Sequence, residues 1–330
     1  MNMPESIGLT VIGGGPAGCA AALAARAEGA AVTLYEKSRF PRHKVCGEFL
    51  SPETGTVIES LGIWPAFTAA RPARLARAIL HVGRRPKRFS LPEPAYSLSR
   101  YRLDDLLLRE AVARGVEVKT MAVPSGLEMQ RQPAIIAHGR QAPARRGERL
   151  FGFKTHFRGP ADDAVEMFFS GGCYVGVSPV EGGAVNVCGL APEALLRPHG
   201  FRPEALFGDA LRARLRGLEP LFDWLVTGPL VFRDGFRDRR GIYLAGDAMG
   251  FVDPFTGSGI LAALLTGRMA GQAASRSVPV EEHTLRCRNA LARQYSVASL
   301  LRGLLGAGLA ESLAALVPGR WLYRLTRPSL

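Results

Sequence analysis

The N-terminal part of the chain combines short apolar runs with closely spaced glycines. Ile7–Ile12 is an apolar, β-branched run that predicts a buried strand, and Gly13–Gly15 follow it directly. The alanine-rich stretch Pro16–Glu28 has a helical pattern, and the run Ala31–Tyr35 predicts a second strand. A strand, a glycine turn, a helix and a second strand in this order are typical of the first half of a doubly wound nucleotide-binding unit.

The middle of the chain changes its hydrophobic period twice. Ser51–Leu61 and Arg102–Arg114 have apolar residues at helical spacing, and Leu75–Leu91 is typical of two edge-like strands joined near Gly83. From Leu150 to Leu190 the period becomes two, which predicts an antiparallel sheet. The strands expected in it are Glu166–Ser170, Cys173–Val177 and Ala184–Leu190, with glycine pairs at 171–172 and 182–183 as hairpins.

The C-terminal part returns to the nucleotide-binding pattern. We expect a helix over Pro203–Leu225, an extended Leu230–Phe232, a buried strand at Gly241–Ala245 and a long helix from Gly259. The predicted fold class is therefore α/β, with a discontinuous Rossmann-like domain of the glutathione-reductase type and an inserted antiparallel β-sheet. The boundaries are 1–74, 96–149 and 235–290 for the nucleotide domain, 75–95 and 150–234 for a substrate domain, and 291–330 for C-terminal helices.

The segment Val297–Val317 is largely apolar, with only Arg302 and Glu311 as charges. Its glycines and mid-segment charges argue against a membrane span. Two alternatives stay open at this stage: packing against the body of the protein, or a peripheral contact with a membrane surface.

Composition narrows the function classes. The 330 residues are 47% hydrophobic with a formal net charge of +13, which favours anionic partners such as phosphates. Arginines are spread widely without interleaved aromatics, so we expect no nucleic-acid partner. The five cysteines show no CxxC pair, which indicates neither disulfides nor a metal site. The N-terminal apolar stretch has no basic flank and contains several glycines, so we expect a cytoplasmic protein without an export signal.

The glycine turn carries the first candidate site. Gly13, Gly15 and Gly18 allow the tight turn, the approach of backbone to pyrophosphate and close helix packing, and the helix that starts at Pro16 and Ala17 offers free amides to phosphate. Glu36 ends the second strand, where a carboxylate accepts hydrogen bonds from ribose hydroxyls.

A second strand and helix distinguish FAD from NAD. Gly246 and Asp247 end the strand that begins near Gly241, and Asp247 is placed to bind a ribityl hydroxyl. The helix that follows begins at Gly257, Ser258, Gly259 and Ile260, with its amides aimed at the flavin ring, where negative charge accumulates on reduction. An NAD dehydrogenase has no use for this second unit. The sequence thus predicts FAD.

These motifs together resemble one superfamily of FAD-dependent oxidoreductases: geranylgeranyl reductases, aromatic hydroxylases of the p-hydroxybenzoate hydroxylase fold and flavin-dependent halogenases. The resemblance rests on Gly13–Gly18, Pro41–Glu48, Arg100 with Asp104, Gly246-Asp247 and Asp253–Gly259. It implies that Arg100 contacts the FAD pyrophosphate and Val123 reaches the adenine. It also implies that Lys37 contacts the cofactor and that Lys44, Cys46 and Gly47 lie beside the isoalloxazine ring.

Cys46 and Glu48 are the catalytic candidates in this loop. Cys46 resembles the cysteine of the geranylgeranyl reductase loop, although a small residue that packs against the ring would serve equally, and His43 is the only nearby base. Glu48 is either a proton donor or a loop hydrogen-bonding group; we favour the second. On the predicted sheet, Phe168, Phe169 and Tyr174 line a lipophilic pocket or simply mark the core face.

The chain departs from its relatives in two ways that matter for chemistry. His138 stands where the superfamily has the aspartate of an Asp-Gly motif, which leaves the route of flavin reduction open, and the stretch Val123–Ile135 before this motif is short. A histidine in this arginine-rich loop is more often a surface residue. The Trp-x-Trp-x-x-Ile-Pro element is missing, the tryptophans being Trp64, Trp224 and Trp321, which argues against a halogenase.

The predicted function is redox chemistry on a carbon–carbon bond of a hydrophobic small molecule, isoprenoid or polyketide-like, by flavin hydride transfer, with NAD(P)H as electron donor. Two alternatives remain: an FAD-dependent aromatic-ring monooxygenase, and a flavin-binding accessory protein without turnover.

Overall fold

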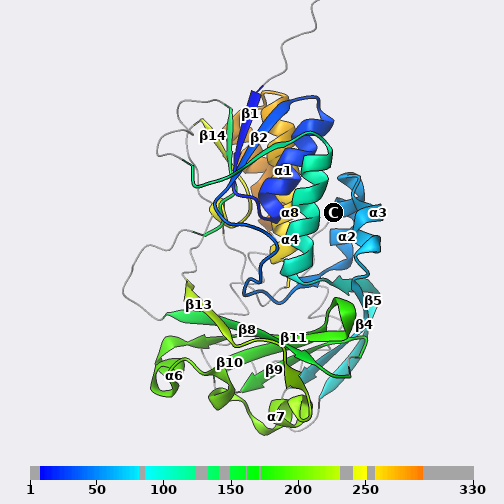
Figure 1. The fold of residues 1–330 in the computed structure, drawn as a ribbon, viewed down its shortest axis with the longest axis vertical. Coiled ribbons are helices and arrows are strands. Elements are labelled where there is room, and N and C mark those ends of the chain that lie inside the picture. Colours follow the sequence, from blue (N-terminus) through cyan, green and yellow to red (C-terminus); the bar gives the residue numbers. More distant parts are fainter. Residues whose placement is uncertain are drawn as a thin grey trace, which may run out of the picture.

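Two β-sheets organise the molecule, one in each half (Figure 1). The computed structural model describes residues 8–81, 86–123, 133–140, 149–160, 162–170, 172–230, 241–250 and 257–292. Helices cover the first sheet in the upper half of Figure 1, and the second sheet lies across the lower half.

The first sheet is parallel and draws its strands from both ends of the described chain. Its order is β14-β7-β1-β2-β6. The strands are β1 (Gly8–Ile12), β2 (Ala31–Glu36), β6 (Glu117–Thr120), β7 (Ala134–Ile136) and β14 (Ile242–Leu244). Because parallel sheets are covered on both faces, their strands are almost continuously apolar, as β7 and β14 are here.

Helices α1 (Pro16–Ala27) and α8 (Gly259–Ser275) pack closely against each other although they are far apart in sequence. A Cβ atom on Gly267 would lie 2.1 Å from the Ala17 carbonyl oxygen, and one on Gly271 would lie 2.2 Å from that of Ala21. Small residues on both helices therefore let the two backbones approach. This contact joins the C-terminal helix to the N-terminal strand–turn–helix unit.

Three more helices surround this pair. Helix α4 (Arg100–Ala113) packs on α1 and is capped by Ser99, whose hydroxyl accepts a hydrogen bond from the Arg102 amide. Helices α2 (Pro52–Ser60) and α3 (Trp64–Ala69) pack against α8 and α4 respectively. Residues 280–292 are also helical.

The second sheet has nine strands and is antiparallel except for one pair. Its order is β12-β8-β11-β10-β9-β4-β5-β3, with β13 also paired to β8; β4 and β9 run parallel. The strands are β3 (Phe49–Leu50), β4 (Ala73–His81), β5 (Lys87–Ser97), β8 (Leu150–Arg158), β9 (Ala164–Ser170), β10 (Cys173–Pro179), β11 (Ala184–Pro192), β12 (Glu219–Pro220) and β13 (Leu225–Leu230).

One face of this sheet packs on its own apolar core. Phe153, Val175 and Val187 lie in it beside Phe207, with Trp224 packed against them. Short elements cover that face: α6 (Glu193–Leu196), α7 (Asp209–Leu215) and the 3₁₀ turns η2 (Arg197–His199) and η3 (Pro203–Leu206). Two further 3₁₀ turns are η1 (Glu181–Gly183) and η4 (Gly246–Ala248). The opposite face of the sheet is turned toward the helical half.

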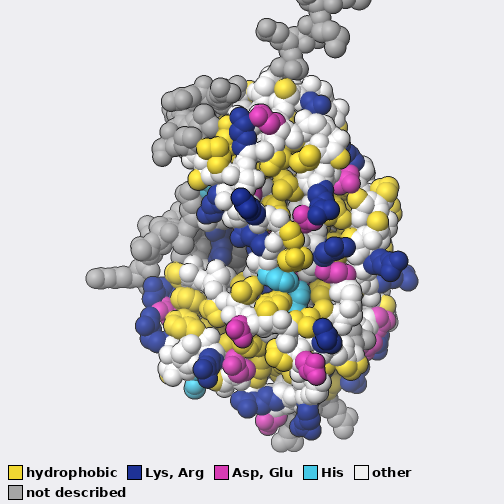
Figure 2. All heavy atoms as spheres, viewed as in Figure 1, with side chains coloured by type: hydrophobic (Ala, Val, Ile, Leu, Met, Phe, Trp, Pro, Cys, Tyr) yellow, Lys and Arg dark blue, Asp and Glu magenta, His cyan; other side chains and the backbone are white. Residues whose placement is uncertain are grey.

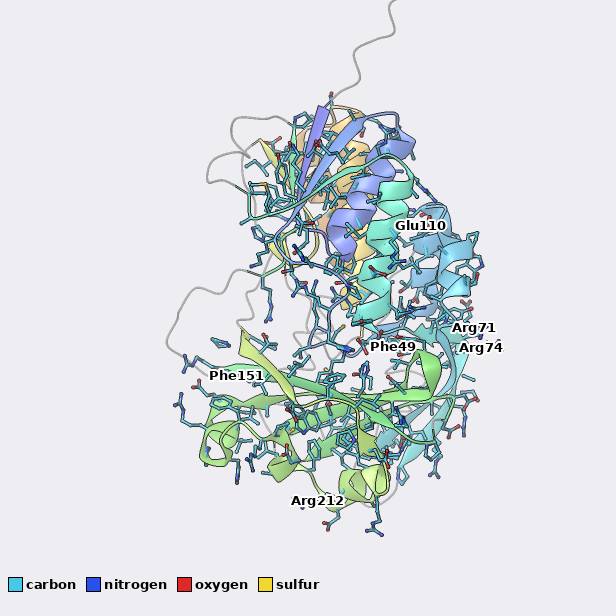
Figure 3. All side chains as sticks on the ribbon, in the orientation of Figure 1. Phe49, Arg71, Arg74, Glu110, Phe151 and Arg212 are labelled. Atoms are coloured by element: carbon cyan, nitrogen blue, oxygen red, sulfur yellow. The ribbon has the colours of Figure 1, made fainter. Side chains whose placement is uncertain are left out.

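The predicted fold class is confirmed: a parallel Rossmann-like sheet and a second, largely antiparallel sheet. The domain boundaries stay a prediction. Phe49–Leu50, which those boundaries assign to the nucleotide domain, pairs with β5 of the second sheet. The same residues connect the two halves, as the position of Phe49 in Figure 3 shows.

Two predictions about local structure are wrong. Pro203–Leu225 is not one helix: Gly217 takes a φ of +78°, Glu219–Pro220 forms β12, and β13 begins at Leu225. Only Asp209–Leu215 is α-helical in that range. The strand β4 is not an edge strand either, since it lies between β5 and β9. Pattern alone did not reveal the pairing that buries it.

Some sequence predictions fall outside the described residues: Gly83, Phe232, most of Val123–Ile135, Asp253–Thr256 and the apolar segment Val297–Val317. Within the described ranges, no helix is long and apolar enough to cross a membrane. The five cysteines are free, as expected. The described residues also contain no cluster of His, Cys, Asp or Glu that could hold a metal ion.

Candidate functional site

A cavity of about 610 Å³ lies between the two sheets and collects most of the predicted cofactor residues. Sixteen of them line it: Gly13, Gly15, Pro16, Ala17, Glu36, Lys37, Lys44, Cys46, Gly47, Arg100, Val123, Gly246, Asp247, Gly257, Gly259 and Ile260; Glu48 lines it too. Gly18 and Ser258 do not line it; Gly18 instead packs against the Gly13 backbone, and Ser258 is buried directly before the helix that begins at Gly259. Figure 2 shows the surface hollowed between the two halves, with Lys and Arg side chains gathered above the hollow.

The glycine turn brings backbone to one end of the cavity. Gly13 has a φ of +109°, and a Cβ there would lie 2.4 Å from the Ala137 carbonyl oxygen. At Gly18 a Cβ would lie 1.7 Å from the Gly13 carbonyl oxygen. Side chains are thus excluded by neighbouring backbone, and the first turn of α1 is left open to a ligand at Gly15. This is the geometry that a pyrophosphate requires at a helix N-terminus.

Glu36 ends β2 beside this turn. Its carboxylate accepts hydrogen bonds from the Gly14 amide at 2.7 Å and from the Ser38 amide at 2.8 Å. The side chain is fixed and almost fully buried at the cavity wall. The position suits the ribose contact predicted from sequence.

Two cations face the turn from the opposite side. A Cβ on Gly15 would lie 3.8 Å from Lys44 Nζ and 3.9 Å from Arg100 Nη2. Both cations are held by the buried Asp104: Arg100 Nε donates to Oδ1 at 2.6 Å, and Lys44 Nζ donates to Oδ2 at 2.8 Å. With one carboxylate against two cations, this cluster of Asp104, Arg100 and Lys44 carries a net positive charge.

The charges in this cluster support one another. Burial raises the pKa of Asp104, but the ion pairs with Arg100 and then Lys44 lower it by more than burial raises it. The net shift is therefore downward, and the carboxylate is ionised. Burial lowers the pKa of Lys44, as do the nearby guanidinium groups of Arg100 and Arg42, and Asp104 opposes that shift. A phosphate group placed at Gly15 would balance the remaining positive charge. The residues present therefore fit the pyrophosphate of FAD.

Asp247 lies at the far side of the turn, after β14. Burial raises its pKa, and Arg140, Arg100 and Lys44 oppose that shift. The carboxylate lines the cavity together with Gly246, whose amide donates to Thr266 of α8 at 2.8 Å. This contact couples the strand end to α8, as the second strand–helix unit predicted.

The loop 44–48 runs between the two sheets. Cys46 is half-buried and lines the cavity, and its sulfur accepts a long hydrogen bond from the Glu48 amide at 3.4 Å. From the second sheet, Asn186 Nδ2 donates to the Cys46 and Gly47 carbonyl oxygens at 3.2 and 3.0 Å. Cys46 thus lies at the cavity wall, with its backbone fixed from β11.

The surroundings of Glu48 are those of a buried, paired carboxylate rather than those of a proton donor. The residue is fully buried, with its carboxylate ion-paired to Lys154 and bonded to His156 Nε2 at 2.8 Å. Its Oε1 also accepts from the Arg100 amide at 2.6 Å. Burial raises the pKa of Glu48, but the contacts with His156 and Lys154 lower it by more than burial raises it, so the net shift of the pKa is downward. An ionised carboxylate with three partners has no proton to donate, which agrees with our preference for a hydrogen-bonding role.

His43 lies on the outer side of the same loop. Its ring stacks on Tyr101 at 4.8 Å between centroids, contacts Phe222 at 4.4 Å and meets His156 edge-on at 5.2 Å. Burial, then Lys154 and His156, lower the pKa of His43 to about 4. The imidazole is therefore neutral near pH 7 and does not line the cavity beside Cys46.

His138 and Val123 lie at the nucleotide end of the cavity, which both line. His138 is exposed, and its Nδ1 is 2.9 Å from the Gly139 carbonyl oxygen. His138 is therefore exposed, as the sequence indicated, and it also borders the cavity. Val123 is half-buried at its wall.

The other end of the cavity is apolar and belongs to the second sheet. Tyr174, Leu190 and Leu230 form a small buried cluster there and line the cavity. Of the aromatics considered from sequence, Tyr174 faces the cavity, Phe169 packs against Tyr174, and Phe168 stacks on His81 in the sheet's own core.

Sequence reasoning missed Lys154, His156 and Asn186. All three are buried on β8 or β11 and point toward loop 44–48 through the hydrogen bonds described above. The available signal was a lysine and a histidine two positions apart in an otherwise apolar strand. Polar residues at alternate positions share one face of a strand, and when buried they require partners.

Known proteins share these features. Residues 7–132 match the FAD binding domain family. Menaquinone reductase of Mycobacterium tuberculosis is 26% identical over 333 residues, covering 82% of this chain and 77% of the relative. Digeranylgeranylglycerophospholipid reductase 2 of Methanopyrus kandleri is 28% identical over 328 residues, covering 83% and 78%. Tryptophan 2-halogenase of Chondromyces crocatus is 35% identical over 122 residues, covering 36% and 23%.

Solved structures share the fold. A flavin-dependent brominase has a TM-score of 0.81 at 19% identity and covers 96% of this chain and 92% of its own. A geranylgeranyl bacteriochlorophyll reductase-like protein from Thermoplasma acidophilum has a TM-score of 0.70 at 17% identity, covering 98% and 92%.

The fold, the glycine turn and the relatives together define an FAD-dependent oxidoreductase. Its N-terminal region matches an FAD binding domain, and over most of its length the chain is similar to a menaquinone reductase and a digeranylgeranylglycerophospholipid reductase.

Proposed function

We propose that this enzyme reduces or oxidises a carbon–carbon bond of a hydrophobic small molecule, isoprenoid or polyketide-like, with NAD(P)H as the electron donor. The observation that carries the proposal is the cavity itself. One end has glycines, cations and Glu36, and the other end has the apolar cluster of Tyr174, Leu190 and Leu230. Bound FAD supplies hydride chemistry, and the apolar end selects which molecule meets it.

The extent of the sequence similarity supports reductase chemistry. The two reductases align with 82% and 83% of the chain, whereas the halogenase aligns with only 36%. The names of the two reductases refer to a quinone and to an isoprenoid lipid, both hydrophobic. The brominase supports the fold alone at 19% identity.

Cys46 is the residue of this chain that we propose to act at the reacting end. It is half-buried at the cavity wall, and the Cys188 and Tyr174 side chains line the same cavity from the second sheet. Addition of a hydride to one carbon of a double bond requires a proton on the other carbon. The Cys46 thiol would hold that proton, whereas Glu48 is ionised and fully paired.

The experiment uses the FAD-loaded enzyme without oxygen, with NADPH or NADH as donor and menaquinone or a geranylgeranyl lipid as acceptor. We expect oxidation of the nicotinamide and a product that has gained two hydrogens. Cys46→Ala should lower kcat by about 10-fold or more with little change in the FAD content, because a proton-transfer group is removed and the cofactor contacts remain.

The aromatic hydroxylase is the outcome that would contradict this proposal. In that case NAD(P)H oxidation would require oxygen in equal amount, and the product would carry a new hydroxyl group. A run with oxygen and an aromatic acceptor beside the anaerobic run therefore separates the two reactions.

A further inference from the structure

The segment Cys46–Glu48 connects the flavin-binding half to the second sheet, and polar side chains of that sheet hold it. Glu48 has a φ of +57°, a left-handed conformation that non-glycine residues rarely adopt. Such a conformation persists only where the surroundings fix it. Its surroundings are therefore a guide to what the segment must do.

The Glu48 carboxylate is the central group. It pairs with Lys154 Nζ and with His156 Nε2, both on one face of β8, and also accepts the Arg100 amide at the start of α4. The Glu48 and Lys154 side chains are both 0% exposed. A buried ion pair seldom adds net stability compared with apolar residues of the same size, so its value lies elsewhere, often in fixing a geometry.

Neutral contacts fix the backbone of the same segment. The Glu48 carbonyl oxygen accepts hydrogen bonds from Ser97 Oγ at 3.0 Å and from the Leu98 amide at 3.2 Å. Asn186 binds the two preceding carbonyl groups from β11. All of these partners except the Arg100 amide come from the second sheet or the residue directly after it. The cofactor contacts of Lys44 and Arg100 run instead through Asp104.

The two sets of contacts hold different parts of this loop. Asp104 holds the cations that face the pyrophosphate position, and Glu48 ties the next residues to the sheet whose apolar cluster ends the cavity. Cys46 lies between the two anchors. The distance between the reacting end of the cofactor site and the substrate end therefore depends on the Glu48 contacts.

We propose that Lys154 and His156 are positioning residues: through the buried Glu48 carboxylate they hold Cys46 at the cavity wall over bound FAD. The inference deepens the proposed function and rests on it only for the identity of the substrate. FAD binding itself is carried by the turn, Glu36 and the Asp104 cluster.

The test measures how well FAD shields the Cys46 thiol from iodoacetamide in the full-length protein. Cys46 is half-buried and the other four cysteines are buried, although Cys188 also borders the cavity, so Cys46→Ser identifies the part of the alkylation that belongs to Cys46. The variants are Lys154→Met, Glu48→Gln and the neutral double variant Glu48→Gln with Lys154→Met. Lys119→Met is the matched control, because Lys119 is 40% exposed and pairs with Glu117 on the surface.

In the wild type and in Lys119→Met we expect FAD to slow alkylation by about 10-fold or more. In Lys154→Met the protection should fall to about 3-fold or less, while the Kd for FAD stays within about 3-fold of the wild-type value. The double variant should recover thermal stability, because no unpaired buried charge remains, and still lack the protection. A loss of stability alone would not produce this separation.

The inference is overturned if Lys154→Met keeps the wild-type protection, or if the double variant regains protection together with stability. It is also overturned if the double variant binds FAD more than about 10-fold more weakly, since the cluster would then belong to cofactor binding. If Lys154→Met does not fold, the protection measured in the double variant alone tests the inference. No readout here uses the substrate, so failure of the proposed reaction leaves this result unaffected.

Discussion

The two ends of the cavity are built from different materials. At the nucleotide end, backbone shapes the turn: Gly13 and Gly18 are required because neighbouring main-chain atoms leave no room for a side chain. At the substrate end, the side chains of Tyr174, Leu190 and Leu230 project from a sheet whose backbone is ordinary. The nucleotide end thus combines a backbone turn with the Glu36, Lys44 and Arg100 side chains, whereas the substrate end consists of apolar side chains.

The two charged clusters, one around Asp104 and one around Glu48, also differ from each other. The Asp104 cluster has two cations for one carboxylate, and the Lys44 side chain is 22% exposed, so it is incomplete without an anion. The Glu48 cluster is closed, with its carboxylate fully buried and paired. One cluster is arranged to receive a ligand, and the other to hold the protein together around it.

The largest effect should come from the backbone-defined end. Gly18→Ala places a methyl group where only 1.7 Å separates it from the Gly13 carbonyl oxygen, so the turn must open. We expect a destabilisation of roughly 4 kcal/mol or more, with loss of bound FAD, measured by urea unfolding and by flavin absorbance after gel filtration. Gly8→Ala is the control, because nothing lies within 4 Å of the added atom. Equal behaviour of the two variants would remove the steric argument.

A smaller effect should come from the open cluster. Asp104→Asn leaves Arg100 and Lys44 without their carboxylate, and we expect a loss of about 3 kcal/mol in the free energy of unfolding. Saturating FAD should reduce this difference, because its pyrophosphate supplies the missing negative charge. The neighbouring surface variant Asp105→Asn breaks only the Arg109 pair and should cost about 0.5 kcal/mol.

Urea unfolding with and without FAD measures both variants. If FAD increased the penalty of Asp104→Asn, the cations would not face the pyrophosphate, and the contrast between an open and a closed cluster would be wrong.

The smallest effect concerns His43, beside the closed cluster. Its pKa is lowered to about 4 in the fold, while the unfolded chain titrates near 6.5. The unfolded chain therefore binds a proton first as the pH falls, and stability contributed by the neutral ring is lost between about pH 6.5 and about pH 4. His43→Phe keeps the stacking on Tyr101 and Phe222 and should flatten this loss by about 1 kcal/mol, an amount reduced for solvent screening.

Unfolding midpoints in urea at neutral pH and at about pH 5 test this. The exposed His199 provides the control variant His199→Phe, measured in parallel. If His43→Phe lost stability in parallel with the wild type over this range, the low pKa of His43 would be refuted.

Much of the nucleotide end could be read from the sequence, because its signals are local. The glycine spacing, the position of Glu36 after β2 and the Gly246-Asp247 strand end each lie within one strand–turn–helix unit. Arg100 and Lys44 were placed through resemblance to known enzymes, and the structure adds Asp104 as the group that holds both. The helix expected over Pro203–Leu225 failed because glycine, proline and sheet pairing interrupt a pattern that looked continuous.

The sequence by itself determined that this protein has a dinucleotide turn, that the dinucleotide is FAD, and that a second sheet follows. Each conclusion depends on residues a few positions apart, where the chain's own geometry fixes their arrangement. Only the tertiary structure decided that Glu48 is a buried, ionised anchor, because its partners Lys154 and His156 are 106 and 108 residues away. Contacts at that separation are set by how the two sheets pack, and no local pattern encodes them.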